Sequence, residues 1–249
     1  MKSMISKLIH GNCLEKMKSI PDGSIDFVLT DPPYGTTACK WDSIIPLDEM
    51  WKQIKRVIKP NAAIVMMACQ PFTSALVMSN PQWFKYDWVW RKPKGTGHLN
   101  AKKQPMRDKE DILVFYKEQC LYNPQMTVGE PYKAKPGKSK RNGEDCYGIY
   151  KDVREDNNGL RYPKQVLDIS IQERMKDHPT QKPLALMEYF IETYSLEGDT
   201  VLDFAMGSGT TGVACKMLKR HFIGIELNDL YFQKAQDRVL GAECLFEKL

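Results

Sequence analysis

The sequence predicts an α/β fold, in which helices cover a mostly parallel sheet and one loop-rich segment is inserted into the chain. Three observations predict it. Short apolar runs alternate with segments of helical periodicity before residue 117, the same alternation returns after residue 184, and residues 117 to 177 show little periodicity. Such alternation is typical of parallel sheets, because each crossover between parallel strands usually contains a helix. We therefore expect both ends of the chain to belong to one sheet.

The first part of the chain predicts five strands and three helices. In the helix at 48–59 the apolar residues Met50, Trp51, Ile54, Val57 and Ile58 lie on one face, and a proline follows its end. The run AAIVMMAC is apolar throughout, as in a buried strand. The expected strands are 7–12, 25–30, 62–69, 85–92 and 111–118, and the expected helices are 13–20, 48–59 and 71–80.

The last part predicts three helices and two strands. An amphipathic helix at 184–196 precedes a short apolar strand at 200–204. A helix at 210–220, a strand at 222–227 and a final helix at 229–240 follow. The segment between the two parts is rich in Lys, Asn, Gly and Pro, which is typical of loops.

Composition excludes several classes of protein. The chain has 249 residues, 42% hydrophobic and 27% charged, as in a globular protein with a substantial core. It contains no run of about 18 apolar residues and no apolar N-terminal stretch, so we expect neither a membrane span nor secretion, and a cytoplasmic location. The seven cysteines and four histidines are scattered and form no CxxC pair. We expect reduced thiols and no metal site.

Basic charge is concentrated in the middle of the chain. The net charge is +5, but residues 91 to 176 hold 19 Lys and Arg against 12 Asp and Glu, and the remainder holds 17 against 19. The middle therefore carries +7 and the rest −2, which favours a polyanionic partner for that region.

A glycine-rich turn lies between the strand at 200–204 and the next helix. Gly207, Gly209 and Gly212 have the GxGxxG spacing of a nucleotide-binding turn, and the following strand ends in Glu226, which suits two ribose hydroxyls. Asp203, four residues before Gly207, would repel the pyrophosphate of a dinucleotide but attract the ammonium of S-adenosylmethionine. The turn therefore predicts S-adenosylmethionine rather than a dinucleotide.

The strand at 25–30 ends in the motif Asp31-Pro32-Pro33-Tyr34. The two prolines lack N–H donors and leave carbonyl acceptors without a regular partner, next to a carboxylate and an aromatic ring. The set suits a planar ligand with an NH₂ group, whose two N–H bonds would go to Asp31 and to the Pro32 carbonyl. Tyr34 would stack on a base that has left the duplex. The motif predicts chemistry at an exocyclic amino nitrogen.

In these motifs the chain resembles the S-adenosylmethionine-dependent DNA amino-methyltransferases, specifically the permuted β group, and it looks similar to some phage-type members. The matching motifs are LIHGNCLEKM, DPPYG, HPTQKP at 178 to 183, and DFAMGSGTTGVAC with GIELN. The resemblance covers the whole chain except residues 117 to 177. The resemblance implies a circularly permuted, Rossmann-like sheet, double-stranded DNA as substrate, a bacterial or phage-infected bacterial cell, and direct methyl transfer to N6 of adenine.

The resemblance also implies roles for individual residues. Asp203, Phe204, Gly207 and Gly209 would hold the methionine part of the cofactor, and Lys182 with Thr180 its carboxylate. Asn12, where many members have Asp, would contact the adenine together with Cys13. The full cofactor set is Asn12, Cys13, Asp31, His178, Thr180, Gln181, Lys182, Asp203, Phe204, Ala205, Gly207, Ser208, Gly209, Thr210, Thr211, Glu226, Leu227 and Asn228.

The variable middle region would read the DNA sequence. The resemblance therefore divides the chain into a catalytic half at 1–116, a target-recognition insertion at 117–177 and a cofactor-binding half at 178–249. Phosphate contacts supply affinity while a few side chains specify bases. The candidates for DNA contact are Lys102, Lys103, Arg107, Lys133, Lys135, Lys138, Lys140 and Arg141, with Tyr132 and Tyr147 interleaved.

Three other functions stay open at this point. An N4-cytosine methyltransferase would use the same chemistry on a smaller ring, although Asp before PPY goes more often with adenine in this family. A DNA-binding module without catalysis is opposed by the intact Asp31 and glycine turn. A dehydrogenase is opposed by Asp203 and by the DPPY motif. The sequence leaves open whether the chain forms a homodimer, and which DNA sequence it recognises.

Overall fold

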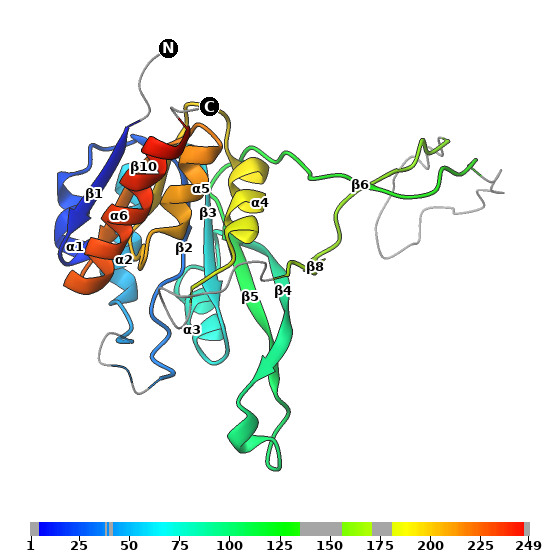
Figure 1. Ribbon diagram of the computed structural model, residues 1–249, viewed down its shortest axis with the longest axis horizontal. Coiled ribbons are helices and arrows are strands. Elements are labelled where there is room, and N and C mark those ends of the chain that lie inside the picture. Colours follow the sequence, from blue (N-terminus) through cyan, green and yellow to red (C-terminus); the bar gives the residue numbers. More distant parts are fainter. Residues whose placement is uncertain (1–4, 38, 40–41, 135–155, 171–180, 247–249) are drawn as a thin grey trace. The chain divides into compact units, whose positions relative to one another are not determined.

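Strands and helices alternate along both ends of the chain in the computed structural model, which describes residues 5–37, 39, 42–134, 156–170 and 181–246 (Figure 1). The strands of the main sheet are β1 (Ser6–His10), β2 (Ile25–Thr30), β3 (Ile58–Ala68), β4 (Phe84–Thr96), β5 (Arg107–Phe115), β8 (Val166–Leu167), β9 (Thr200–Asp203) and β10 (His221–Glu226). The helices are α1 (Cys13–Lys16), α2 (Leu47–Val57), α3 (Phe72–Ser79), α4 (Leu184–Tyr194), α5 (Thr210–Met217) and α6 (Asp229–Phe246).

The sheet is mostly parallel, as the sequence predicts. Its strand order is β1-β10-β9-β2-β3-β5-β4-β8, and β5 runs antiparallel to both of its neighbours. From β9 the chain continues to β10 on one side, whereas from β2 it continues to β3 on the other. The strand order therefore reverses between β9 and β2. In open α/β sheets, ligands bind outside the carboxyl ends of the strands at such a point.

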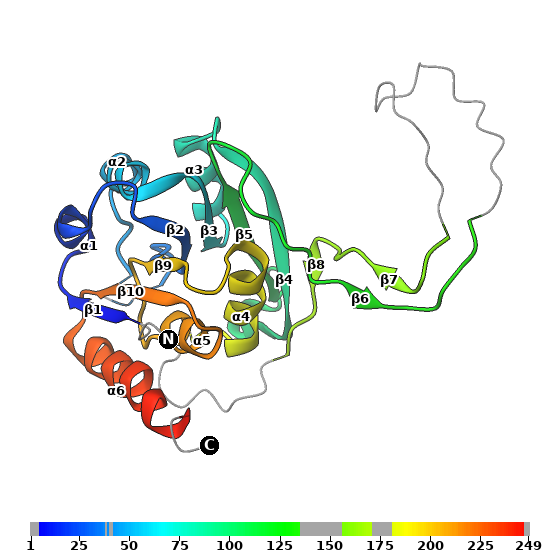
Figure 2. The same cartoon turned by 90° about the horizontal axis from the view of Figure 1, so that it is seen from above.

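Helices cover both faces of the sheet. Figure 2 shows α1, α2 and α3 on one face and α4, α5 and α6 on the other. Side chains alternate along β3: Ala63, Val65 and Met67 pack in the core beneath α4 and α5, whereas Ile64 and Met66 pack with α2. Because β3 is buried on both faces, its sequence is apolar throughout rather than alternating.

Some boundaries differ from those expected. The helix expected at 48–59 is Leu47–Val57, and Ile58 already has extended backbone as β3 begins. Lys59 precedes Pro60, and a residue before proline is driven out of the helical region. The helix expected at 13–20 ends at Lys16 and continues as a 3₁₀ turn, Met17–Ser19. The last helix extends to Phe246 rather than to residue 240.

The antiparallel pair β4 and β5 forms a long ribbon that extends beyond the rest of the sheet (Figure 1). Both strands are longer at this end than the sequence predicts, because they pair with each other as far as Thr96 and Arg107. The connection contains a 3₁₀ turn, His98–Asn100. Lys102 and Lys103 are exposed in it.

Residues 124–164 form a separate compact unit. Its described part contains two short antiparallel strands, β6 (Thr127–Val128) and β7 (Leu160–Arg161). The Arg161 guanidinium lies 4.8 Å from the centre of the Tyr132 ring. This cation–π contact stabilises the pairing of the chain segments that contain β6 and β7.

The rest of the chain, residues 1–123 and 165–249, forms the first unit, and the residues that flank residues 124–164 are hydrogen-bonded within it. The Asn123 N–H donates to the Thr193 carbonyl of α4 at 2.8 Å. The Gln165 side chain donates to Asp87 of β4 at 2.7 Å, and its carbonyl accepts from the Val89 N–H at 2.9 Å. The residues directly before and after residues 124–164 are therefore held within the first unit.

Among the residues that the structure describes, no helix has both the length and the apolar character that a membrane span requires.

Candidate active site

The DPPY motif and the glycine turn lie at the carboxyl ends of neighbouring strands. Asp31 directly follows β2, and Asp203 is the last residue of β9, which pairs with β2. The Thr30 hydroxyl donates to Asp203 Oδ1 at 2.8 Å and joins the two strand ends. Two motifs that are far apart in sequence thus meet where the strand order reverses.

Asp203 is buried, and three donors within the protein reach its carboxylate. Its Oδ1 also accepts from the Ala205 N–H at 3.1 Å, and its Oδ2 accepts from the Thr211 hydroxyl at 2.7 Å. Burial raises the pKa of Asp203 to about 7, even though these hydrogen bonds favour the carboxylate. A group with this pKa gains its charge near neutral pH and binds a cation best when ionised.

The glycine turn between β9 and α5 uses backbone conformations that favour glycine. Gly207 has φ +52° and Gly209 has φ +81°. A Cβ at Gly207 would meet nothing within 4 Å, whereas one at Gly209 would touch Ala235 of α6 at 3.0 Å. The turn therefore packs on α6 at Gly209 and faces open space at Gly207.

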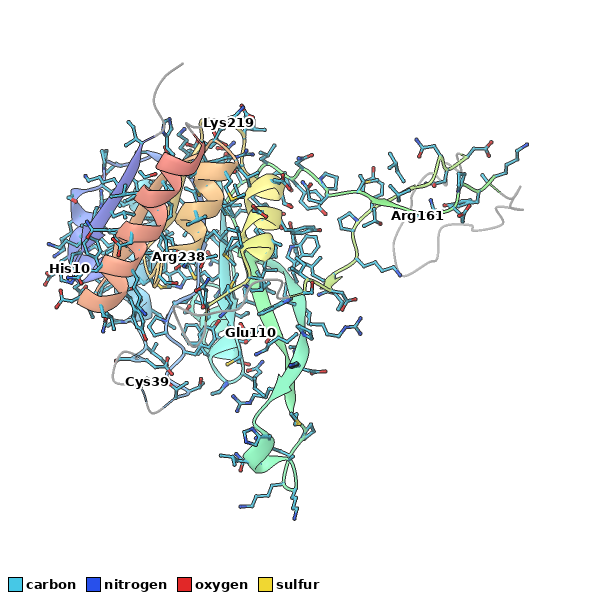
Figure 3. All side chains as sticks on the ribbon, in the orientation of Figure 1. His10, Cys39, Glu110, Arg161, Lys219 and Arg238 are labelled. Carbon is cyan, nitrogen blue, oxygen red and sulfur yellow. The ribbon has the colours of Figure 1, made fainter. Side chains whose placement is uncertain are left out.

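Arg238 of α6 holds this turn, and sequence reasoning missed it. Its Nη1 donates to the carbonyl and the hydroxyl of Ser208, both at 2.7 Å, and to the Thr210 hydroxyl at 3.2 Å. Figure 3 labels Arg238 beside α6. In the sequence an arginine on an amphipathic helix is typical of a solvated face, so no local signal distinguishes it.

Three further residues of the predicted cofactor set lie at the turn in different ways. Phe204 is buried in the core on the α2 side of the sheet, so only its backbone belongs to the turn. The Gln181 side chain accepts a hydrogen bond from Ser208 at 3.4 Å. Ala205 contributes its N–H to Asp203, as described above.

Glu226 ends β10 beside the same turn. Its two oxygens accept from the Gly207 N–H at 2.9 Å and from the Asn228 N–H at 2.7 Å. Burial raises its pKa. The Asn228 side chain accepts from the Tyr231 N–H at the start of α6, and the Leu227 carbonyl lies 3.0 Å from the His10 ring. A carboxylate has about four acceptor sites, so Glu226 keeps capacity for further donors.

Asn12 and Cys13 lie at the end of β1, next to β10. The Asn12 side chain caps α1 by accepting from the Leu14 N–H at 2.9 Å. Burial raises the pKa of the Cys13 thiol to about 11, and the Glu226 carboxylate adds to the rise. Cys13 is therefore a neutral thiol near Glu226, on the β10 side of the glycine turn.

The DPPY motif presents a carboxylate, a carbonyl and a ring together. Asp31 accepts a hydrogen bond from the Tyr34 hydroxyl, and its side chain is 29% exposed, so it is within reach of a ligand. Within the part of the chain that the structure describes, no hydrogen bond reaches the Pro32 carbonyl. The Tyr34 ring is stacked on Phe72 of α3, with centres 5.5 Å apart. These groups are fixed by backbone and packing before any ligand binds.

The loop that follows the motif is held by Asp42, a residue that sequence reasoning did not single out. Its carboxylate accepts from the N–H groups of Gly35, Thr36 and Thr37 at 2.7 to 2.9 Å. Gly35 has φ +66°, and a Cβ there would lie 2.9 Å from Ile44. The chain therefore needs glycine directly after Tyr34.

Lys182 of the HPTQKP motif lies on Asp31. Its Nζ donates to Asp31 Oδ2 at 2.6 Å and lies 3.1 Å from Glu110 Oε2 of β5. Burial would lower the pKa of Lys182, but the carboxylates of Asp31 and Glu110 outweigh it and raise that pKa. His178 and Thr180 lie outside the described residues. The expected contact of Lys182 with the cofactor carboxylate stays a prediction.

The predicted DNA contacts that the structure describes lie in two places. Lys102, Lys103 and Arg107 are exposed on the β4–β5 ribbon. Lys133 and Tyr132 are exposed in the unit formed by residues 124–164. The remaining candidates, Lys135, Lys138, Lys140, Arg141 and Tyr147, lie outside the described residues.

Comparison with known proteins identifies relatives of this chain. The N6_N4_Mtase family, described as DNA methylase, matches residues 25–237. The type II methyltransferase M.HpaI of Haemophilus parainfluenzae is 30% identical over 95% of this chain and 74% of its own length. The type II methyltransferase M.HinfI of Haemophilus influenzae is 26% identical over 94% and 68%.

Solved structures agree with this result. The complex of M1.HpyAVI with SAM is similar with a TM-score of 0.65 and 28% identity, covering 94% of this chain and 99% of that one. The PvuII DNA methyltransferase, which is cytosine-N4-specific, has a TM-score of 0.66 at 18% identity and covers 98% of this chain and 93% of that one. At that identity the second likeness concerns the fold alone.

A mostly parallel sheet with a glycine turn and an amino-group motif at its switch point defines an S-adenosylmethionine-dependent DNA methyltransferase. The chain belongs to the N6_N4_Mtase family of DNA methylases. The resemblance drawn from the four sequence motifs is thereby confirmed, and the dehydrogenase alternative is wrong.

Proposed function

We propose that the enzyme methylates N6 of adenine at specific sites in double-stranded DNA, and that Asp31 is its catalytic residue. The observation that carries this proposal is the position of Asp31 and the Pro32 carbonyl one strand away from the glycine turn. An amino group bound there would lie beside the cofactor site. Asp rather than Ser before PPY supports adenine over cytosine as the target.

The residues around the glycine turn fit S-adenosylmethionine. The open space at Gly207 leaves room for a ligand against the backbone, and buried Asp203 offers a carboxylate for an ammonium group. Glu226 keeps acceptor sites for ribose hydroxyls, and Asn12 and Cys13 lie near it for an adenine ring. When bound, S-adenosylmethionine supplies an electrophilic methyl group on its sulfonium.

Asp31 and Pro32 prepare the target amino group. Two hydrogen bonds, one to the carboxylate and one to the carbonyl, draw the nitrogen toward tetrahedral geometry and make its lone pair available. After transfer the nitrogen carries one proton in excess, and Asp31 is placed to accept it. Tyr34 would stack on the base and offset part of the cost of its leaving the duplex.

Nucleoside analysis by mass spectrometry tests the proposed target. Unmethylated plasmid DNA is treated with the enzyme and S-adenosylmethionine, digested and compared with DNA treated with Asp31→Ala. We expect N6-methyladenine in the first sample only. N4-methylcytosine in its place would support the runner-up activity, and cofactor binding without any methylated base would support a DNA-binding module. Sequencing the modified plasmid identifies the recognition site.

The β4–β5 ribbon and the unit formed by residues 124–164 are the proposed DNA-binding elements. Both expose basic side chains, and phosphate contacts by lysine and arginine give affinity that falls with salt. The inserted segment at 117–177 is proposed to read the base sequence, and the two halves around it to carry the chemistry. A homodimer is compatible with this proposal. Light scattering, which measures the molar mass in solution, tests whether two copies of the chain associate.

Replacing both Lys102 and Lys103 by Ala should weaken DNA binding in a salt-dependent way. Each lost phosphate contact lowers the slope of log affinity against log salt by about 0.9, so we expect a change of about 2 for the pair. Fluorescence anisotropy with a labelled duplex between low and moderate salt measures the slope. The matched control replaces two exposed lysines elsewhere, Lys18 and Lys52. An unchanged slope in the ribbon variant would remove the ribbon from the DNA interface.

A further inference from the structure

Four alternating charges form a chain that begins at the catalytic carboxylate. Asp31 contacts Lys182, Lys182 lies 3.1 Å from Glu110 Oε2, and Glu110 Oε1 lies 2.8 Å from Lys92 of β4. The side chains of Lys182, Glu110 and Lys92 are only 9%, 13% and 16% exposed. Figure 3 labels Glu110 on the ribbon side of the site.

Glu110 occupies an unusual place for a charged residue. It is paired with Trp90 in the β4–β5 register, on the face of the sheet that packs against α4. A charge that is partly removed from water is costly unless it is paired. Its two lysine partners supply that pairing, and neither of them lies on β5.

Lys182 is shared between two carboxylates in unequal ways. It donates a hydrogen bond to Asp31 Oδ2 at 2.6 Å, whereas its Nζ lies 3.1 Å from Glu110 Oε2. Burial opposes the charge of Lys182, and the carboxylates of Asp31 and Glu110 both stabilise it, Asp31 more strongly. The strength of the ion pair between Lys182 and Asp31 therefore depends on how strongly Glu110 also attracts the Lys182 ammonium.

We propose that Glu110 is a positioning residue that acts through Lys182 on the catalytic carboxylate. Glu110 shares the charge of Lys182 with Asp31, and so keeps Asp31 basic enough to accept a hydrogen bond and a proton from the target amino group. Lys182 donates to Asp31 Oδ2 and the Tyr34 hydroxyl donates to Oδ1. Without Glu110, Lys182 would pair with Asp31 alone and make it less basic. This inference rests on the proposed role of Asp31.

The electrostatics of the cluster give the direction of the effect. Burial raises the pKa of Asp31, Lys182 opposes the rise, and the negative charge of Glu110 adds to it. Two other groups act on Asp31: the Tyr34 hydroxyl, which donates a hydrogen bond to it, and the Asp203 carboxylate at the end of the neighbouring strand β9. Burial also acts on Glu110, but Lys182 and Lys92 hold its pKa below the usual value. Removing Glu110 should therefore lower the pKa of Asp31, and removing Lys92 should raise it.

Two substitutions with opposite expected signs test the proposal. The rate of methyl transfer at saturating S-adenosylmethionine and plasmid DNA is measured from pH 5 to 9 for Glu110→Gln, for Lys92→Met and for the parent enzyme. Activity requires ionised Asp31, so its acid limb follows the pKa of that group. We expect the limb to move down by about one pH unit in Glu110→Gln and up by a similar amount in Lys92→Met.

The rate on the plateau gives a second readout. A less basic Asp31 should lower kcat of Glu110→Gln about ten-fold, with the KM for DNA unchanged. Glu110→Asp, which retains the charge, should recover most of that loss. The matched control is Asp111→Asn: Asp111 is the next residue of β5, is also buried and ion-paired, and contacts Thr73 and Lys109 rather than Lys182. It should keep the parent pH profile.

The outcomes separate this inference from the proposed function. Shifts of the same sign in both variants, or no shift, would overturn the role of Glu110. Thermal unfolding and calorimetric binding of S-adenosylmethionine establish that each variant is folded, and Lys92→Met carries the test alone if Glu110→Gln is unfolded. Normal turnover by Asp31→Ala would instead overturn the proposed function, whatever Glu110 does.

Discussion

The Asp31→Ala enzyme is expected to lose methyl transfer almost completely while it still binds duplex DNA. The hydrogen bond from the amino group to Asp31 strengthens as the nitrogen becomes tetrahedral and positively charged, so its loss raises the barrier without weakening the ground-state complex. Loss of one such preorganised contact costs on the order of 10²-fold or more in rate. The exposed lysines of the ribbon are unchanged in this variant.

Single-turnover transfer of a radiolabelled methyl group measures the rate, and fluorescence anisotropy measures DNA binding. Asp26→Asn is the control, since Asp26 lies at the start of the same strand, where it contacts Lys59 and the Thr200 N–H. An Asp31→Ala enzyme with near-normal turnover would show that the amino group is activated elsewhere. A variant that loses DNA affinity and rate equally would assign Asp31 to binding.

Asp203→Ala is expected to weaken S-adenosylmethionine binding by about 30-fold or more. Truncating one member of a buried ion pair typically costs 2 kcal/mol or more, because the partner charge is left without compensation. In the free protein Thr30 and Thr211 hold the carboxylate ready for the ligand ammonium. Titration calorimetry at pH 8 measures the dissociation constant. Asp199→Asn at the opposite end of β9 is the control and should bind as the parent does.

The same carboxylate predicts a dependence on pH with a definite sign. Burial raises the pKa of Asp203 to about 7, so the cofactor affinity of the parent should rise between about pH 6 and pH 8 as the group ionises. In the free protein the free energy of unfolding should fall as the pH rises from about 4 to about 7. Over this range Asp203 keeps its proton in the folded state but has lost it in the unfolded chain. Asp203→Asn should remove both effects. A pH-independent dissociation constant in the parent would contradict this assignment.

Much of the fold could be predicted because the local signals agree with it. Strand and helix segments have distinct periodicities, and the glycine turn and DPPY each follow a strand, which fixes the edge of the sheet where they lie. The neighbouring position of β2 and β9 could not be predicted from spacing. These strands pair through Phe27 with Val201 and Val28 with Leu202, and the hydrogen bond between Thr30 and Asp203 at their ends joins residues 173 positions apart along the chain.

The contacts that complete the site were harder to predict for a different reason. Glu110 stands in the segment RDKED, where alternating charges are typical of a solvated strand, but in the structure its carboxylate is largely buried between Lys92 and Lys182. Arg238 lies on an amphipathic helix, where an arginine is typical of a solvated face. The ion pair between Lys182 and Asp31 joins residues that are 151 positions apart along the chain. Each contact is made in the tertiary structure and leaves no trace in local periodicity.

The anchoring of Asn123 on α4 and of Gln165 on β4 has a consequence for how such enzymes diversify. Because the chain leaves and re-enters the first unit at fixed points, residues 124–164 can lengthen, shorten or be exchanged without altering the path of β4, α4 or the strand ends that hold the site. Drift in this segment is thereby uncoupled from selection on the chemistry. The junctions after Asn123 and before Gln165 are the positions at which chimaeras of related enzymes should be joined.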